Sequence, residues 1–152
     1  MSPAKPLTGT EPLHHAGLPL GPTVLDFWRW SASDFVSNAQ RGVLAEFLVA
    51  HLLDIPRTVR VEWDAVDLVT PEGLRIEVKS AAYLQSWRQA RDSTIRFDVA
   101  RKLDWDADTN TSAAEPRRSA DVYVFCLLAH RDLATLDPLD ASQWRFVVLG
   151  TR

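Results

Sequence analysis

Three charged side chains in the middle of the chain have the types and the spacing to do chemistry together. Asp67 is followed, after nine intervening residues, by Glu77, and Lys79 comes two residues later. Two carboxylates can ligate a hard divalent cation, and a nearby ammonium group can orient a water molecule or help to deprotonate it. For these groups to act together, the chain must fold back and bring Asp67 close to Glu77.

A β-hairpin is the element that would achieve this. The segments 64–70 and 74–80 are rich in β-branched and aliphatic residues, which favour strands. Pro71 and Gly73 lie between them, where Pro fixes φ and Gly permits a positive φ. The sequence therefore predicts two antiparallel strands joined by a three-residue turn.

The register of this hairpin decides where the charges lie. A three-residue turn pairs Leu68 with Ile76 and places Asp67 directly opposite Glu77. Because side chains alternate along a strand, Lys79 then shares a face with both carboxylates. The other face is expected to point into a core and is apolar, with Val66, Leu68, Leu74, Ile76 and Val78.

The charged face predicts a metal site for phosphodiester hydrolysis. Two opposed carboxylates repel each other unless a cation lies between them, and Mg²⁺ or Mn²⁺ with oxygen ligands is the usual solution. The carbonyl of Val78 is the natural third ligand, and Lys79 would act on the attacking water or on phosphate charge. Asp64 lies at an odd offset from Asp67 and would point to the opposite face, so Asp67 is the expected ligand.

A long helix is expected before the hairpin, from Asp34 to Leu53, with Ser33 as its N-cap. Glu46 lies in this helix among small apolar neighbours. A carboxylate there is costly unless it is paired, protonated or bound to a cation, and the alternative is that it lies at the edge of the apolar face and reaches water. The apolar positions recur at helical spacing: Phe35, Val36, Ala39, Val43, Leu44, Phe47, Leu48 and Leu52.

The rest of the chain predicts one domain, residues 25–152, preceded by a flexible proline-rich arm, residues 1–24. Residues 104–118 lack periodicity and predict a long surface loop. Further strands are expected at 58–63, 95–99, 121–128 and 144–149.

Composition limits the partners. The formal net charge of −3 provides no global attraction for nucleic acid, so a local patch or a metal ion would have to supply it. The single cysteine, Cys126, lies in an apolar run, where a buried inert thiol is expected, and fits a reducing compartment. No segment has the apolar length of a membrane span or a signal peptide, so we expect a cytoplasmic protein without membrane association.

Asp67 together with the Glu-Val-Lys triplet at 77–79 resembles the signature of the PD-(D/E)xK nuclease superfamily, the restriction-endonuclease-like fold. The resemblance covers about residues 34–85 well, and the remainder only in the order of elements. It implies an α/β (α+β) fold with a mixed central β-sheet, a long first helix and a motif-bearing β-hairpin. The sequence departs from the signature at Val66, where the superfamily name has a proline.

The resemblance also implies an activity and a set of site residues. Members bind Mg²⁺ through the Asp and the Glu, and many place a further Glu on the first helix and a Gln after the Lys. The implied protein is a Mg²⁺- or Mn²⁺-dependent nuclease, acting on DNA. The implied metal ligands are Asp67, Glu77 and the carbonyl of Val78, and the implied catalytic residues are Lys79, Glu46 and Gln85.

Two other functions are consistent with the sequence. One is an inactive module of the same fold that binds nucleic acid or a protein partner, and the other is an unrelated α/β interaction protein with a charged hairpin face. The choice between DNA and RNA and the formation of a homodimer stay open. The segment after the motif is only slightly positive, because seven cations (Arg88, Arg91, Arg96, Arg101, Lys102, Arg117, Arg118) alternate with six acids (Asp92, Asp98, Asp104, Asp106, Asp108, Glu115).

Overall fold

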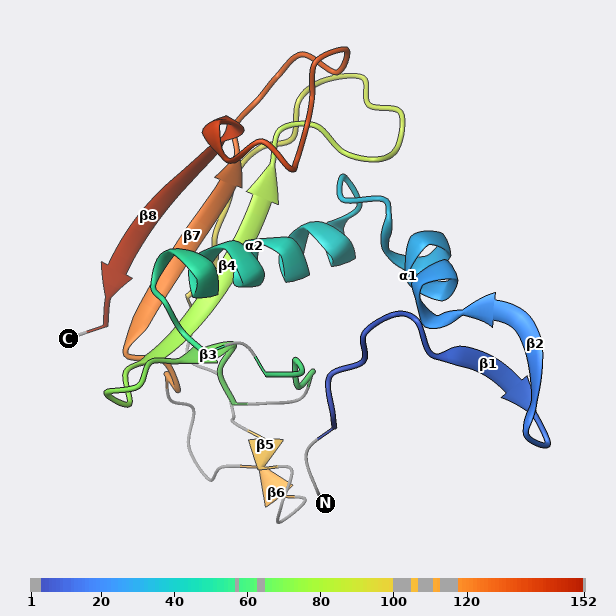
Figure 1. Ribbon diagram of the computed structural model, residues 1–152. Helices are drawn as coiled ribbons and strands as arrows, with labels where there is room; N and C mark the ends of the chain where they lie inside the picture. The colour runs from blue at the N-terminus through green and yellow to red at the C-terminus, as the bar shows by residue number, and fades with distance from the viewer. Residues whose placement is uncertain are drawn as a thin grey trace.

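The computed structural model describes residues 4–56, 58–62, 65–99, 105–106, 111–112 and 118–151. Its centre is a mixed four-stranded sheet in the order β3-β4-β7-β8, with one long helix, α2, across one face (Figure 1). The pairs β3/β4 and β7/β8 are antiparallel, and β4/β7 is parallel. The described elements are β1 (Pro12–His15), β2 (Leu18–Thr23), α1 (Val24–Ala32), α2 (Asn38–Leu52), β3 (Leu68–Val69), β4 (Arg75–Ala82), β5 (Trp105–Asp106), β6 (Thr111–Ser112), β7 (Val122–Leu128), the 3₁₀ turn η1 (Ala141–Gln143) and β8 (Trp144–Gly150).

The main core lies between α2 and the sheet. Ala45 and Val49 of α2 are buried against Ile76 of β4 and Cys126 of β7. Alanine at the contact lets the helix lie close to the strands, and burial of the aliphatic side chains supplies the main stabilisation. Cys126 is fully buried, and burial raises the pKa of its thiol to about 12, which fits the predicted inert cysteine.

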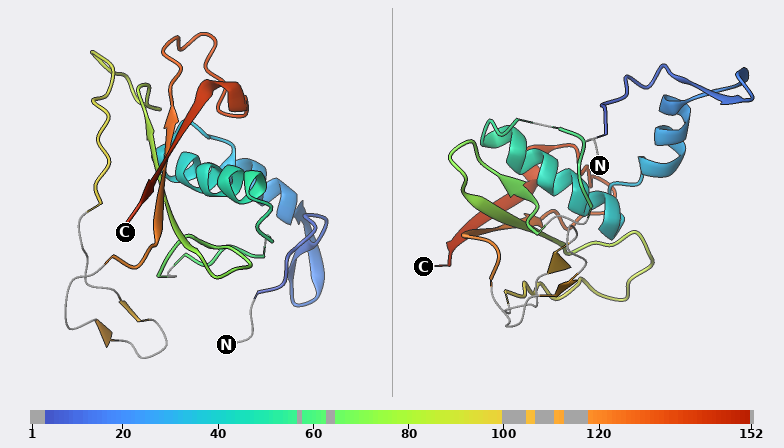
Figure 2. Two further views of the ribbon diagram at one scale, coloured as in Figure 1. Left: turned by 90° about the vertical axis from the view of Figure 1, so that its left-hand side faces the viewer. Right: turned by 90° about the horizontal axis from the view of Figure 1, so that it is seen from below.

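The opposite face of the sheet carries a smaller core. Tyr123 is buried there with Val66, and Val99 and Phe125 pack against this cluster. The Phe97 ring packs against the Phe125 ring in a tilted arrangement, with ring centroids 4.7 Å apart. The segment 93–99 therefore covers this face, on the side away from α2, as the left view of Figure 2 shows.

The hairpin register is confirmed, but its first strand is much shorter than predicted. Leu68 pairs with Ile76 and Val69 with Arg75, and the backbone N–H of Thr70 donates to the carbonyl of Leu74 across the three-residue turn. The prediction of a strand over 64–70 is wrong within the described residues, because β3 contains only Leu68–Val69. The second strand, β4, extends to Ala82, two residues beyond its predicted end.

The long helix begins later than predicted. Ser33 is the C-cap of α1, and Ser37 is the N-cap of α2, its side chain accepting from the backbone N–H of Gln40. The residues between the two caps form a turn in which the Asp34 carboxylate accepts from Val36 N–H. An Asp that bonds to the backbone two residues on favours a turn over a helix start, which explains the shift.

Three other predicted segments differ from the structure. Among the described residues of 58–63 no strand is present, and 95–99 is extended but pairs with no strand of the described residues. Within 104–118 two short strands, β5 and β6, pair with each other, and most of that predicted loop lies outside the described residues. The strands predicted at 121–128 and 144–149 are confirmed as β7 and β8.

The N-terminal arm contains secondary structure that the sequence did not predict. β1 and β2 form a hairpin whose turn, Ala16-Gly17, has φ of 48° and 82°. Two positive φ angles are typical of a type I′ turn, and prolines are tolerated because both strands are edges. Thr23 then caps α1 in a capping box with Asp26.

The fold is therefore mixed α and β, as predicted, with a mixed four-stranded sheet. In the part of the chain that the structure describes, neither helix has the length and apolar character needed to cross a membrane.

Candidate active site at the edge of β4

The geometry of the site follows from the early end of β3. Beyond Leu68 no strand of the described residues pairs with β4 on that side. The backbone N–H of Val78 instead donates a hydrogen bond to the Asp67 carboxylate, with 2.7 Å between Val78 N and Asp67 Oδ2. Asp67 thus takes the place of a strand at the sheet edge, rather than lying directly opposite Glu77 as predicted.

This contact also fixes the direction of the Val78 carbonyl. The N–H and C=O groups of one residue in a strand point to the same side, so the carbonyl of Val78 points toward the Asp67 side of β4. The side chain of Val78 is buried beneath α2. A main-chain oxygen and a carboxylate therefore lie at the same open edge.

Glu77 and Lys79 lie on the face away from α2, as the alternation predicted. They pair in register with Tyr123 and Phe125, which belong to the smaller core. Lys79 Nζ lies 2.8 Å from Glu77 Oε1 and 5.9 Å from the centre of the Tyr123 ring. Both charged side chains are about one quarter exposed, at 21% and 25%, so the pair is reachable from solvent.

Glu46 reaches the same region from α2, with a cation as its partner. Arg60 holds it with two hydrogen bonds, 2.6 Å from Nε to Oε2 and 2.8 Å from Nη2 to Oε1. The Glu46 side chain is only 13% exposed, so ion pairing, rather than contact with water, compensates its burial. The hydrogen bond to Glu46 raises the pKa of Arg60, and the negative charge of Asp67 adds to that effect.

The electrostatics at Asp67 are those of a crowded acidic site. Burial raises the pKa of Asp67 to about 6, and repulsion from Glu77 and Glu46 adds to this. The hydrogen bond from Val78 N–H and the charge of Lys79 act in the opposite direction. The structure therefore brings Glu77, Lys79 and Glu46 within electrostatic range of Asp67, and a carboxyl pKa shifted this far is typical of functional sites.

A cleft of about 380 Å³ opens beside this cluster, between α2 and the segments 55–56, 58–61 and 66–69. Glu46, Arg60 and Asp67 line it together with apolar side chains such as Phe47 and Val66. Asp67 and Glu46 are thus accessible from the cleft, while Glu77 and Lys79 lie on the face of β4 away from α2, with Asp67 at the edge between the two.

The sequence comparison decides the family. The model of the family described as bacteriophage T4 endonuclease IV matches residues 26–151, which is most of the chain. The chain belongs to the T4 endonuclease IV family. No curated protein and no solved structure matches it. Family membership supports a hydrolase that cleaves phosphodiester bonds in nucleic acid, and it counts against an unrelated interaction protein.

Gln85 lies apart from the other predicted residues of this family member. It follows the end of β4, at least three residues beyond Lys79, which corresponds to about 10 Å of strand. Its side chain accepts from Arg41 at 3.3 Å and donates to the Ala82 carbonyl at 3.0 Å and to Ser93 Oγ at 3.1 Å. These contacts hold a loop, as described below.

The sequence did not point to two functional candidates in this family member, Arg60 and Arg41. Arg60 was not distinguished from other surface arginines, since only the fold brings it to Glu46 across 14 positions of chain. Arg41 lies on α2, is 3% exposed and contacts the loop after β4. A buried arginine leaves no signal in a sequence, because the same residue is common on exposed helix faces.

The donor chemistry of the site fits Mg²⁺ or Mn²⁺. Among the described residues no three His, Cys, Asp or Glu side chains are arranged to hold a metal ion. Asp67, Glu77 and the Val78 carbonyl would supply two carboxylates and one main-chain oxygen, and Mg²⁺ commonly takes one or two carboxylates and completes its shell with water and phosphate. Asp64, the alternative ligand, lies outside the described residues.

Proposed function

We propose that this member of the T4 endonuclease IV family is a Mg²⁺- or Mn²⁺-dependent DNA endonuclease with a site of the PD-(D/E)xK kind. The observation that carries the proposal is the Asp67 carboxylate held on the N–H of Val78, beside Glu77 and Lys79. Glu77, Val78 and Lys79 are consecutive in the sequence, whereas Asp67 comes from the segment just before β3. Because β3 begins only at Leu68, the Asp67 side chain is free to turn toward the backbone N–H of Val78.

The proposed ligands are Asp67, Glu77 and the carbonyl of Val78. A divalent ion bound there would act as a Lewis acid on the scissile phosphate and offset the mutual repulsion of the carboxylates. Burial raises the pKa of Asp67 and that repulsion adds to it, so the site favours a cation in electrostatic terms.

Lys79 is the proposed catalytic residue that acts on the attacking water. Its ammonium group is held 2.8 Å from Glu77, and its side chain is 21% exposed to solvent. From there it can donate to the water and orient it toward phosphorus, or neutralise charge that develops on the phosphate. Lys79 also neutralises Glu77, and this reduces the repulsion between Glu77 and Asp67 before substrate binds.

Glu46 is the proposed outer carboxylate. Arg60 neutralises it when no other cation is near, and the Arg60 side chain is 41% exposed, so its guanidinium can exchange this partner for a substrate phosphate. Gln85 has a structural role in the loop after β4, because both its amide oxygen and its amide nitrogen are hydrogen-bonded there.

The test is cleavage by the full chain and by two lysine variants. We expect the unaltered protein to cleave a plasmid and oligodeoxynucleotides in millimolar Mg²⁺ or Mn²⁺ and to stop when EDTA is added. Lys79→Ala should lower the rate by at least about 100-fold, the usual size of a general acid–base contribution. Lys5→Ala, which removes an exposed lysine of the arm, should cleave like the unaltered protein.

A binding measurement separates this proposal from an inactive module of the same fold. Metal should raise the melting temperature of the unaltered protein, and Asp67→Asn with Glu77→Gln should abolish that shift. Cleavage by Lys79→Ala at the rate of the unaltered protein, or cleavage that persists in EDTA, would overturn the assignment. Binding of DNA without cleavage under any metal would favour the inactive module.

A further inference from the structure

The loop that follows β4 exposes a tryptophan and two arginines at its tip. Trp87 is 56% exposed, and Arg88 and Arg91 are exposed beside it. Within the part of the chain that the structure describes, neither guanidinium has an ion-pair partner. The loop's one acid, Asp92, lies 3.6 Å from Arg131, so its charge is compensated and the tip is positive.

Hydrogen bonds inside the loop hold this tip in one shape. Gln89 Oε1 accepts from the backbone N–H of Gln85 at 2.7 Å, and Gln89 Nε2 donates to the Tyr83 carbonyl at 3.2 Å and to Ser93 Oγ at 3.0 Å. The backbone N–H of Ser93 closes the loop on the Tyr83 carbonyl at 2.9 Å. Two glutamine side chains thus fill the interior and leave the exposed residues preorganised.

The loop is also fixed to the rest of the fold from two sides. From α2, the buried Arg41 donates to Gln85 and to the Val36 carbonyl, and it also contacts Asn38. From the connection after β7, the Arg131 guanidinium lies 3.8 Å from the centre of the Tyr83 ring. Figure 1 shows the loop and this connection together at the end of the sheet where β4 and β7 finish.

The position of the loop relative to Lys79 suits a polymeric substrate. From Lys79 to Tyr83 the strand covers about 13 Å, or about four nucleotide steps of a B-form strand. The segment 93–99 then returns along the same face, with Phe97 on Phe125, the register partner of Lys79. Arg96 of that segment is exposed, so cations extend from the loop tip back toward the site.

We infer that the loop 84–92 is a nucleic-acid contact that positions the substrate for the site at β4. Arg88 and Arg91 contact backbone phosphates, and Trp87 packs against a base or sugar. Arginine suits phosphate because its guanidinium bonds in a bidentate manner, and an exposed aromatic ring gains energy from stacking on a base. The local charge explains how a chain of net charge −3 can hold a polyanion. The inference rests on the proposed function for its substrate.

The experiment measures binding and cleavage separately. Fluorescence anisotropy of a labelled oligodeoxynucleotide, single-stranded and as a duplex, gives Kd in EDTA, where no cleavage is expected. Trp87→Ala should weaken binding by roughly tenfold. Arg88→Ala with Arg91→Ala should weaken it and lower the slope of log Kd against log salt by about 2. In Mg²⁺, both variants should raise KM and leave kcat near that of the unaltered protein.

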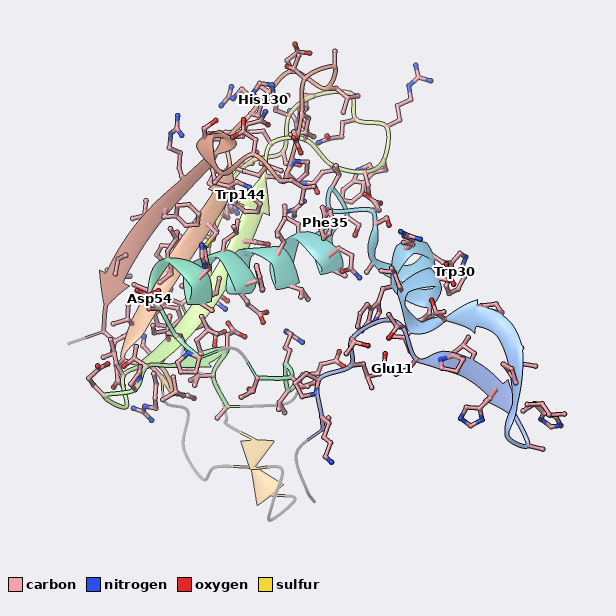
Figure 3. All side chains as sticks on the ribbon, in the orientation of Figure 1. Glu11, Trp30, Phe35, Asp54, His130 and Trp144 are labelled. Atoms are coloured by element: carbon pink, nitrogen blue, oxygen red, sulfur yellow. The ribbon has the colours of Figure 1, made fainter. Side chains whose placement is uncertain are left out.

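Matched controls lie on α1. Trp30 is 85% exposed and points away from the sheet, as Figure 3 shows, and Arg29 is exposed one residue before it. Trp30→Ala and Arg29→Ala should therefore bind like the unaltered protein. All replaced side chains are exposed, so circular dichroism and melting temperature should not change.

The outcomes separate the loop from the chemistry. If the loop variants bind and cleave like the unaltered protein, the inference is overturned while the proposed function stands. If the unaltered protein binds DNA without cleaving it and the loop variants bind more weakly, the inference stands while the proposed cleavage fails. Equal loss of binding in the α1 controls would overturn a specific role for the loop.

Discussion

The Asp67 carboxylate accepts a 2.7 Å hydrogen bond from the backbone N–H of Val78, and this contact substitutes for a strand at the edge of β4. In a longer hairpin, a backbone carbonyl would satisfy that N–H. A carboxylate in its place adds a charge to the sheet edge next to Glu77 and Lys79. The relationship between these two residues therefore creates the candidate site.

The raised pKa of Asp67 predicts a pH-dependent cost to stability. Its folded pKa of about 6 lies above the ordinary value of 3.8, so the folded protein retains the proton more strongly than the unfolded chain. Its contribution to stability is fully present below about pH 4 and is lost as the pH rises through about 6, by at most about 3 kcal/mol.

Asp67→Asn tests this prediction in metal-free protein. Urea unfolding in EDTA should show the variant more stable than the unaltered protein at pH 8, because Asn carries no charge and can still accept from Val78. The two proteins should converge near pH 4, which serves as the internal control. A variant that is less stable at pH 8 would contradict the cause assigned to the pKa shift.

The ion pair between Glu46 and Arg60 should stabilise the fold. Arg60→Ala removes two hydrogen bonds and leaves a carboxylate of 13% exposure beside Asp67, so the free energy of unfolding should fall by about 1–3 kcal/mol at pH 7. The pKa of Asp67 should rise further, since a nearby positive charge is lost. Denaturant unfolding and NMR titration of the carboxyl measure the two effects.

A double-mutant cycle with Glu46→Gln provides the control for this pair. If the coupling is direct, Arg60→Ala should have little further effect in the Glu46→Gln background. Arg75→Ala, which removes a comparable pair with Asp121 at 3.1 Å, should destabilise without altering the pKa of Asp67. Additive effects of the two changes would contradict direct pairing.

Two glycines should respond to alanine with opposite signs. Gly42 lies inside α2, and an added Cβ would meet only Ser80 Oγ at 3.8 Å, an ordinary contact. Gly42→Ala should therefore stabilise by about 0.5–1 kcal/mol through helix propensity. Gly73 has a φ of 85° in the hairpin turn, and Gly73→Ala should destabilise by about 1–2 kcal/mol.

Thermal and urea unfolding of both glycine variants measure this contrast. Each variant changes one Cβ, so the two serve as controls for each other. A destabilised Gly42→Ala would indicate that α2 lies closer to β4 than the 3.8 Å contact implies.

Local chemistry explains how much of the fold the sequence predicted. The turn at 71–73 and the alternation after it set the register of Leu68 with Ile76 and the shared face of Glu77 and Lys79, since both depend on neighbours within a few residues. The hairpin of the arm was not predicted, because Ala16-Gly17 is a weak turn signal and because prolines in a sequence argue against a strand even though edge strands tolerate them.

The sequence by itself determined the match to the T4 endonuclease IV family and the side of β4 on which Glu77 and Lys79 lie. Only the tertiary structure decided that β3 ends at Leu68, that Asp67 bonds to Val78, and that Glu46 is paired with Arg60. It also decided that Gln85 supports a loop through Arg41. The physical reason is that hydrogen bonds and charges act between residues distant in the sequence, and their partners exist only once α2 and the sheet have packed.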